Sequence, residues 1–233
     1  MSKKKGTLIV LDGTDGSGKS TQFKMLVERM RERGYLMTDI KFPFYGSPAC
    51  VLVERYLAGE YGNNADDVNI HAASMFYAMD RYDAWAKNYN GWREVYEAGG
   101  IVIADRYTSA NMIHQGGKLH TMIERFEFFA WLENTEYGLF GLPKPDQVIL
   151  LDMPASRAIS LLQKRQGENG EAADIHEKDV EFIRRCHESA MDAACALEWG
   201  VVACASANGI RTPEEIHEDV WRQVVEVLER EKR

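Results

Sequence analysis

The chain has 233 residues, of which 45% are hydrophobic and 27% charged, and this composition excludes a disordered protein. A chain of this length can bury roughly 70–75% of the surface that it exposes when unfolded, so its core needs no disulfide or structural metal. Asp and Glu total 36 against 28 Lys and Arg, and the net charge of −8 argues against binding to nucleic-acid polymers while permitting a pocket that binds phosphates.

Short apolar segments that end in a carboxylate occur three times, at residues 7–12, 101–105 and 147–152. Such runs are typical of parallel strands that are buried on both faces. Two weaker segments, 38–42 and 201–205, are also predicted to be strands. Between the strands, hydrophobic periodicity predicts helices at 19–33, 49–57, 69–89, 122–132, 154–165, 177–197 and 213–231, and a polar loop at 166–173.

This alternation predicts the α/β class, with a five-stranded parallel sheet covered by helices on both faces. No internal repeat or linker interrupts it, so we expect one domain over residues 1–233. No apolar run approaches the roughly 20 residues needed to cross a bilayer, so we expect no membrane partner. The cysteines form no C-x-x-C pair, and reduced thiols in the cytoplasm are the simplest interpretation of Cys50, Cys186, Cys195 and Cys204.

Residues 13–20 match the pattern G-x-x-x-x-G-K-[ST] between a predicted strand and a predicted helix. Glycines in such a loop let successive backbone N–H groups converge on phosphate oxygens, and the helix adds its positive end. We expect Lys19 to bridge the β- and γ-phosphates of ATP and the Ser20 hydroxyl to bind Mg²⁺. The alternative is a Gly/Ser turn with an incidental lysine. The predicted ATP-binding residues are Gly13, Thr14, Asp15, Gly16, Ser17, Gly18, Lys19, Ser20 and Thr21.

The rest of the chain narrows the class of P-loop protein. A GTPase would carry D-x-x-G after a later strand and N-K-x-D on a base-binding loop, and neither is present. A motor ATPase would usually end a strand in paired acids, whereas here Asp105 precedes Arg106. An Asp at a strand end suits Mg²⁺, and an Arg beside it suits a monophosphate, so we predict a small-molecule kinase. A structural ion pair between the two residues is the alternative.

Two pairs of side chains have the spacing of one helical face. Tyr77 and Arg81 lie four residues apart, so a ring and a guanidinium can stack on a base and donate to its carbonyl. A half-buried helix face is the alternative. Asn111 and Gln115 are also four apart, and either amide oxygen can accept from a pyrimidine N3–H. Asp15 is unusual beside phosphates, and it is either a capping carboxylate or an acceptor for a sugar hydroxyl.

Six segments, taken in order, resemble the thymidylate kinase family of P-loop nucleoside monophosphate kinases. They are LDGTDGSGKSTQ (11–22), FPFY (42–45), YLAGEYG (56–62), FYAMDRY (76–82), DRYTSANMIHQGGK (105–118) and VILLDMP (148–154). The resemblance implies a three-layer P-loop NTPase fold with a mobile lid, ATP as donor, Mg²⁺ as cofactor, dTMP as acceptor and a homodimer.

The resemblance also implies roles for residues on the acceptor side. Asp15 would bind the 3′-OH of the deoxyribose, Tyr77 would stack on thymine in place of the usual Phe, and Arg81 would bond thymine O4. Arg106 and Tyr45 would face the phosphate of the acceptor.

Three positions on this side depart from the family pattern or match it weakly. His114 stands where the family holds a ring against the sugar C2′, although a lone His is more often structural. Phe44 lies where an Arg often stands near the Tyr, and Ala110 lies where many members have Ser, the Ser here being Ser109. An uncompensated loss of one charge-assisted hydrogen bond costs about 1.5–3 kcal/mol, which would weaken binding or catalysis without changing the reaction.

Phosphoryl transfer needs a further positive charge on the moving group. Gly16 stands where one subclass carries an Arg, so we predict that the charge comes from a lid over residues 164–176. A helix end with basic residues that match its dipole is the alternative. The candidates are Arg165, which we prefer, and Arg157, Lys164 and Arg184.

Together these observations predict transfer of the ATP γ-phosphate to dTMP, with Lys19, Asp105, Arg106 and Arg165 as catalytic residues and with Ser20 and Asp105 on Mg²⁺. Two alternatives remain open. One is a P-loop kinase for another nucleotide or a deoxynucleoside, and the other is a nucleotide-binding paralogue without catalytic activity.

Overall fold

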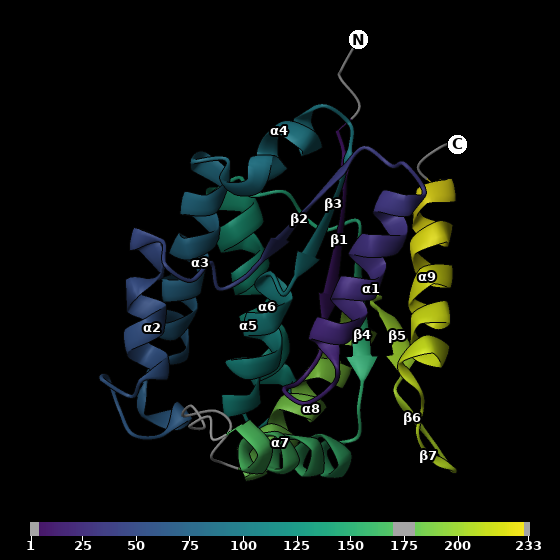
Figure 1. Ribbon diagram of the computed structural model, residues 1–233. Coiled ribbons are helices and arrows are strands. Elements are labelled where there is room, and N and C mark those ends of the chain that lie inside the picture. Colours follow the sequence, from purple (N-terminus) through teal and green to yellow (C-terminus); the bar gives the residue numbers. More distant parts are fainter. Residues whose placement is uncertain (1–4, 170–179, 231–233) are drawn as a thin grey trace.

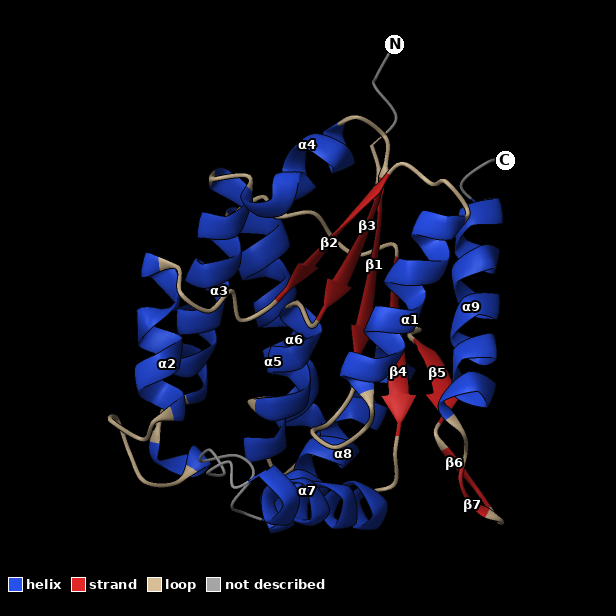
Figure 2. Ribbon diagram, viewed as in Figure 1, coloured by secondary structure: helices blue, strands red, loops and turns tan. Residues whose placement is uncertain are grey.

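A five-stranded parallel sheet in the order β2-β3-β1-β4-β5 forms the centre of the computed structural model, with helices on both faces (Figures 1 and 2). The model describes residues 5–169 and 180–230, apart from the side chains of residues 164–169. This arrangement confirms the predicted fold class. The strands of the sheet are β1 (Thr7–Asp12), β2 (Met37–Lys41), β3 (Ile101–Asp105), β4 (Gln147–Asp152) and β5 (Gly200–Ala203).

Helices cover the sheet in two groups, because side chains of a buried strand point alternately to its two faces. Ile9 and Leu11 of β1 pack with α1 and α9, whereas Leu8 and Val10 pack in the cluster on the opposite face. The helices are α1 (Lys19–Glu32), α2 (Val51–Leu57), α3 (Ile70–Ala86), α4 (Trp92–Glu97), α5 (Thr108–His114), α6 (Met122–Glu133), α7 (Ala155–Asn169), α8 (Val180–Ala196) and α9 (Pro213–Arg230).

The register of the sheet decides what stands at its functional edge. Leu11 pairs with Asp105 of β3 and with Ile149 of β4, so β1 and β3 end level with each other. The P-loop follows β1 and the Asp105-Arg106 pair closes β3, which places both at the same carboxyl edge of the sheet. Ligand crevices of parallel α/β sheets form at this edge, where the strand order reverses.

Several sequence predictions need correction. The helix predicted at 69–89 ends at Ala86, because Asn88 and Asn90 adopt left-handed backbone conformations. The helix expected from residue 49 starts at Val51, after a 3₁₀ turn at Pro48–Cys50. Helix α4 and a small hairpin of β6 (Ala205–Ser206) and β7 (Gly209–Ile210) were not predicted, since such short elements carry little periodicity.

The polar loop predicted at 166–173 is wrong at its start, because α7 continues to Asn169. Gln and Glu are good helix formers, and the single glycine at 167 costs only about 1 kcal/mol within a helix. Residues 170–176 of the predicted lid lie outside the described residues. Among the helices that the structure describes, none combines the length and apolar composition that a bilayer crossing requires.

Candidate active site

A cavity of about 670 Å³ opens at the carboxyl ends of β1 and β3. The P-loop forms one wall and side chains from α3 and α5 form the other, so the predicted donor and acceptor groups share one space. Gly13 and Thr14 of the loop are buried beneath it. The predicted residues that line the cavity are Asp15, Gly16, Ser17, Gly18, Lys19, Ser20, Thr21, Tyr45, Tyr77, Arg81, Asp105, Arg106, Asn111, His114 and Gln115.

The glycines of the P-loop are required by its backbone and by α7. Gly16 and Gly18 have φ of 79° and 85°, which favour residues without a Cβ. A Cβ on Gly16 would lie 2.6 Å from the carbonyl oxygen of Ala158 in α7. An Arg at this position would therefore clash with α7, consistent with a charge supplied from elsewhere.

The Lys19 amine is folded down onto the loop from the first residue of α1. Its Nζ donates to Thr14 O at 2.8 Å and lies 3.8 Å from Asp15 Oδ1. Burial, followed by repulsion from Arg106, lowers the pKa of Lys19 to about 8. A phosphate bound at the loop would oppose both effects, so the amine is prepared for an anionic ligand.

Arg106 is held in a strained conformation at the mouth of the cavity. Its φ of 65° lies in the left-handed region, which is costly for a residue with a Cβ and is often found at functional sites. Its Nη2 pairs with Asp15 Oδ1, and its Nη1 donates to His114 Nε2 at 2.7 Å. Burial alone would lower the pKa of Arg106, but Asp15, Asp12 and Asp105 raise it, so the guanidinium stays charged.

The carboxylate that ends β1 was predicted as a strand end, but the sequence assigned no role to it. Asp12 is fully buried, and it accepts from Ser109 Oγ at 2.6 Å and from the Gly13 N–H at 2.9 Å. Burial raises the pKa of Asp12. Ser109 therefore stabilises the start of the loop through Asp12, while Ala110 lines the cavity. The Ser does not replace the hydroxyl that Ala110 lacks.

Arg81 lies in a buried polar cluster with Glu136, a residue that the sequence analysis did not single out. Its Nε and Nη2 donate to the two carboxylate oxygens of Glu136, both at 2.6 Å, and Nη2 also donates to Asn111 Oδ1 at 2.8 Å. Glu136 accepts from Thr108 Oγ1 at 2.9 Å as well. The alternative for Tyr77 and Arg81 was a half-buried helix face: Tyr77 is half-buried, whereas only 1% of Arg81 is exposed, and both residues line the cavity.

At the phosphate end, Lys41 joins the predicted residues. Its Nζ lies 3.5 Å from Asp105 Oδ2, and both side chains line the cavity with the hydroxyl residue Ser20. The sequence did not indicate Lys41, because it belongs to no motif and is the last residue of β2, directly before the FPFY segment. It adds a cation to the part of the cavity wall that holds Asp105.

Aromatic residues flank the acceptor side. The Tyr77 ring lies 6.2 Å from the Tyr56 ring at 86°, and Tyr45 is 62% exposed at the rim. Phe44, which lies where the family pattern often has an Arg, stacks on Tyr89 with ring centroids 4.7 Å apart. Its backbone N–H donates to Asp80 Oδ2 at 2.8 Å. Phe44 thus packs this segment and supplies no charge.

Of the four candidates for the lid charge, the structure describes the side chains of Arg157 and Arg184. Arg157 and Arg184 do not line the cavity, and the Arg184 guanidinium lies 3.2 Å from the Glu181 carboxylate on the surface of α8. The side chains of Lys164 and Arg165 lie outside the described residues. Leu161 and Leu162 of α7 do line the cavity, and this helix lies against Gly16 of the P-loop.

Comparison with known proteins agrees with this geometry. The family model described as thymidylate kinase matches residues 11–219 of the chain. The chain belongs to the thymidylate kinase family. It is 33% identical over 195 residues to the thymidylate kinase of Mycobacterium tuberculosis, covering 83% of this chain and 87% of that protein. The thymidylate kinase of Plasmodium falciparum is 28% identical over 225 residues, covering 97% of this chain and 92% of that protein. The human thymidylate kinase is 26% identical over 220 residues, covering 94% of this chain and 90% of that protein.

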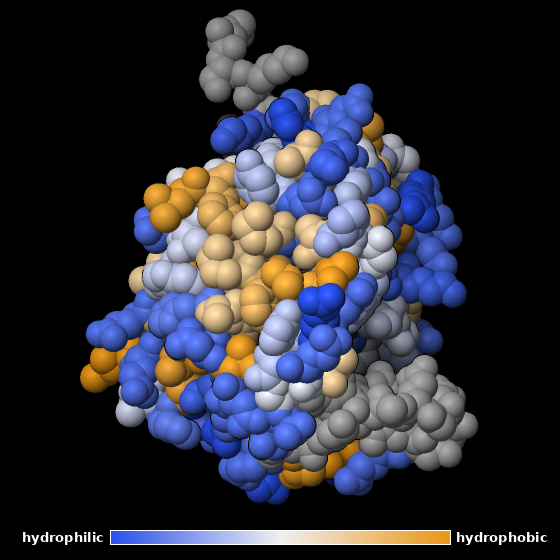
Figure 3. Space-filling view, turned by 90° about the vertical axis from the view of Figure 1, so that its left-hand side faces the viewer, coloured by the Kyte–Doolittle hydropathy of each residue, from blue (hydrophilic) through white to orange (hydrophobic). Residues whose placement is uncertain are grey.

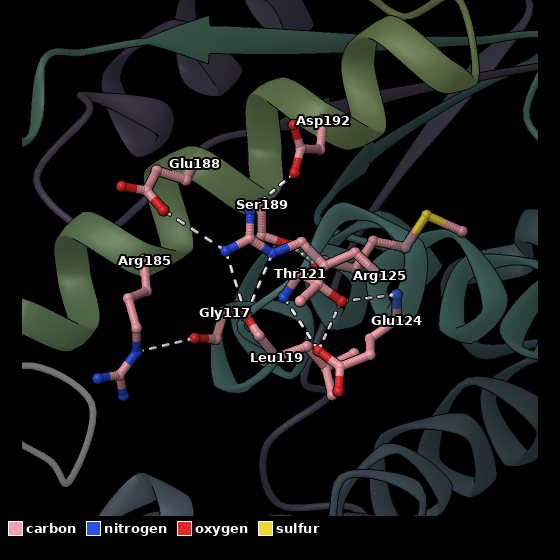
Figure 4. Close-up of polar contacts among 10 residues, drawn as sticks. Gly117, Leu119, Thr121, Glu124, Arg125, Arg185, Glu188, Ser189 and Asp192 are labelled. Atoms are coloured by element: carbon pink, nitrogen blue, oxygen red, sulfur yellow. Dashed lines mark hydrogen bonds and ion pairs between the residues drawn. The ribbon is translucent and has the colours of Figure 1, made fainter.

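In this thymidylate kinase family member, α6 and α8 contact α5 and the turn that follows it (Figure 4). Ser189 Oγ donates to Met112 O at 2.7 Å, and Arg185 Nε donates to Gly117 O at 3.0 Å. Arg125 of α6 donates to Leu119 O from two nitrogens and pairs with Asp192 at 2.7 Å. These contacts hold the turn after α5.

We expect Gly117→Ala to destabilise the fold. A Cβ at this position would lie 2.9 Å from Cys186 Sγ and 3.0 Å from the Cys186 backbone nitrogen in α8. Overpacking of this kind costs about 1–3 kcal/mol, or about 2–4 °C in Tm per kcal/mol for a chain of this size. Thermal unfolding measures it. Gly138→Ala is the control, because its nearest neighbour is the exposed side chain of Asn134, and equal melting of the two variants would contradict the expectation.

Proposed function

We propose that this enzyme transfers the γ-phosphoryl group of ATP to dTMP, giving ADP and dTDP. The observation that supports the proposal is the shared cavity, which brings the P-loop together with Tyr77 and Arg81 of α3 and with Asn111 of α5. Two cations, Lys19 and Arg106, line this space, and both lie beside the Asp15 carboxylate of the P-loop. The family match supports the same reaction, and it disfavours both a kinase for an unrelated acceptor and a paralogue without activity.

The acceptor side is rich in hydrogen-bond donors. Among the described residues, neither Asn111 Nδ2 nor Gln115 Nε2 has a hydrogen-bond partner, although both are buried and both residues line the cavity. Leaving such donors unpaired costs about 1–3 kcal/mol each, so a ligand with carbonyl oxygens is the fitting occupant. Thymine carries two carbonyls on either side of its N3–H. The Asn111 oxygen, which already accepts from Arg81, retains a second lone pair for that N3–H.

The transfer step requires alignment more than covalent help. An oxygen of the dTMP phosphate attacks the γ-phosphorus of ATP, and the bond from that phosphorus to the β,γ-bridging oxygen breaks. The electron pair of the broken bond leaves with ADP. Lys19 stabilises the donor phosphates, and Arg106 stabilises the attacking phosphate, so both neutralise charge that spreads over the transferred group.

The oxygen ligands for Mg²⁺ are present. The Ser20 hydroxyl and the Asp105 carboxylate line the same cavity, and hard oxygen donors with phosphate and water are the usual magnesium ligands. We propose that these two groups hold the metal, with Asp105 exchanging its contact to Lys41. Held there, the metal would supply Lewis-acid stabilisation of the negative charge that develops on the phosphates.

Two further assignments belong to the proposal. Asp15 and His114 both contact Arg106, so the groups that we assign to the sugar lie beside the group that we assign to the acceptor phosphate. Asp15 would bind the 3′-OH, and His114 would lie near C2′. Arg165 is our candidate for the lid charge, because it follows the cavity-lining Leu161 by about one turn of α7.

A panel of acceptors tests the substrate. We expect turnover with ATP, Mg²⁺ and dTMP, measured as ADP release, to exceed turnover with dCMP, CMP, AMP, GMP and thymidine by at least about 100-fold, because those acceptors lack the carbonyl pattern or the phosphate. Ribothymidine monophosphate separately tests His114 as the side chain that disfavours a 2′-OH. Turnover of another acceptor without turnover of dTMP would remove the substrate assignment, and nucleotide binding without any turnover would favour the inactive paralogue.

We also propose a homodimer of single-domain chains in the cytoplasm. Leu52 of α2 and Met79 and Tyr82 of α3 are exposed. Hydrophobic surface is visible on the side of the molecule that carries these two helices (Figure 3). A patch of this kind often marks an interface. All four cysteines are free, as in a reducing compartment. Light scattering after size exclusion tests the dimer, with Met79→Glu expected to shift the mass toward the monomer.

A further inference from the structure

We propose that Glu136 is a positioning residue that presents Arg81 to the acceptor base and thereby sets the preference for a base with a carbonyl at its 4-position. The inference rests on the proposed function, and it concerns a residue that belongs to none of the six family-like segments. Glu136 does not line the cavity, so any influence on the base must pass through Arg81.

Glu136 and Arg81 form a closed pair in the interior. Glu136 is fully buried and Arg81 is 1% exposed, and each carboxylate oxygen accepts from a different guanidinium nitrogen at 2.6 Å. A two-point contact of this type fixes the plane of the guanidinium as well as its distance. Burial alone would lower the pKa of Arg81, but the Glu136 carboxylate raises it, so the pair stays charged.

The remaining contacts leave a defined donor. A guanidinium has five N–H groups. Within the described part of the chain, Nε gives its hydrogen to Glu136, Nη2 gives one to Glu136 and one to Asn111, and Nη1 gives one to the carbonyl of Tyr107 at 3.3 Å. One N–H on Nη1 is left, and Arg81 lines the cavity. That single donor is the group that we assign to the base.

A fixed donor discriminates between bases by charge pattern. A carbonyl at the 4-position accepts from the N–H, whereas the amino group of cytosine would place donor against donor. A mobile arginine can turn away from the amino group, but a guanidinium held at two points cannot do so without breaking a buried ion pair. Selectivity therefore depends on the carboxylate that holds Arg81.

The backbone explains how Glu136 reaches this position. Helix α6 runs directly into a π-helical turn at Asn134–Leu139, in which the Phe140 N–H donates to Thr135 O at 2.9 Å, five residues back. Widened turns of this kind rotate the following side chains relative to a regular helix, and they are frequent at functional sites. Here the turn buries Thr135 and Glu136 while Asn134, Gly138 and Leu139 are exposed.

The test compares Glu136→Gln with wild type, with ATP saturating while the acceptor is varied and with dTMP saturating while ATP is varied. We expect KM for dTMP to rise about 10- to 100-fold, the dTMP/dCMP ratio of kcat/KM to fall at least about tenfold, and KM for ATP to change less than about twofold. Glu136→Asp keeps the charge but is one methylene shorter, so it should lose selectivity while retaining most of the stability. In an Arg81→Met background, Glu136→Leu should change selectivity no further.

Asp192→Asn is the matched control. It removes a carboxylate 2.7 Å from a buried arginine, Arg125, that does not line the cavity (Figure 4). It should lower Tm without changing the dTMP/dCMP ratio.

Wild-type selectivity in folded Glu136→Gln or Glu136→Asp would overturn the positioning role, and so would failure of both variants to fold, since Glu136 would then serve the core alone. Absence of dTMP turnover in the wild type would instead refute the proposed function.

Discussion

Replacing Lys19 by Met is expected to lower kcat by about 10²–10³-fold or more, because it removes a preorganised cation from the transferred phosphate. The fold should persist, since burial disfavours the charge of this amine and, among the described residues, its contacts are a hydrogen bond to Thr14 O and an ion pair with Asp15. The exposed Lys24 lies on the same helix, and Lys24→Met is the matched control with wild-type turnover. Steady-state kinetics measures the loss of kcat, and thermal melting shows whether the fold persists. Undiminished activity in Lys19→Met would remove the P-loop lysine from the mechanism.

The depressed pKa of Lys19 gives this prediction a pH signature. ATP prefers the charged amine, so ATP affinity of the wild type should fall as pH rises above about 8. Stability has the opposite sign: between pH 8 and 10.5 the unfolded chain holds more protons on this amine, so its contribution to the free energy of unfolding rises with pH. Lys118, whose pKa burial also lowers to about 8, acts on stability in the same window. The difference between wild type and Lys19→Met therefore isolates Lys19, and equal pH dependence of ATP affinity in both would contradict its role.

Arg106→Gly should separate activity from stability. The glycine accepts the φ of 65° without strain, which offsets about 1–3 kcal/mol of the loss of the contacts to Asp15 and His114. Activity has no such compensation, because the substitution removes the guanidinium that contacts both Asp15 of the P-loop and His114 of α5. We expect kcat/KM for dTMP to fall by at least about 10²–10³-fold with only a small change in Tm.

Glu198→Gly is the control for backbone relief. Glu198 also has a positive φ, of 54°, and it lies away from the cavity, so its replacement should change Tm by less than about 2 °C and leave kinetics unchanged. A large drop in Tm for Arg106→Gly, with activity reduced only in proportion to the unfolded fraction, would assign Arg106 to the fold instead of the reaction.

Much of the site is determined by local sequence. The P-loop can be predicted because its glycines, its Lys and the strand and helix around it are contiguous, and the phosphate site is built from their backbone. The strands 101–105 and 147–152 are predicted at their observed bounds, since continuous apolar runs have few other stable conformations. That Asp105 and Arg106 meet the P-loop also follows, because parallel strands end at one edge of the sheet.

The remaining features depend on residues far apart in the chain that packing brings together. Glu136 reaches Arg81 across 55 positions through a π-helical turn that has no sequence signature, and Ser109 reaches Asp12 across 97. Spacing placed Tyr77 and Arg81 on one helical face, but only the tertiary structure showed that Arg81 is buried and held by a carboxylate. The sequence by itself determined the chemistry of the phosphate loop, because that chemistry is local. The tertiary structure decided how the acceptor side is held, because a buried charge needs a partner and only the fold brings that partner within reach.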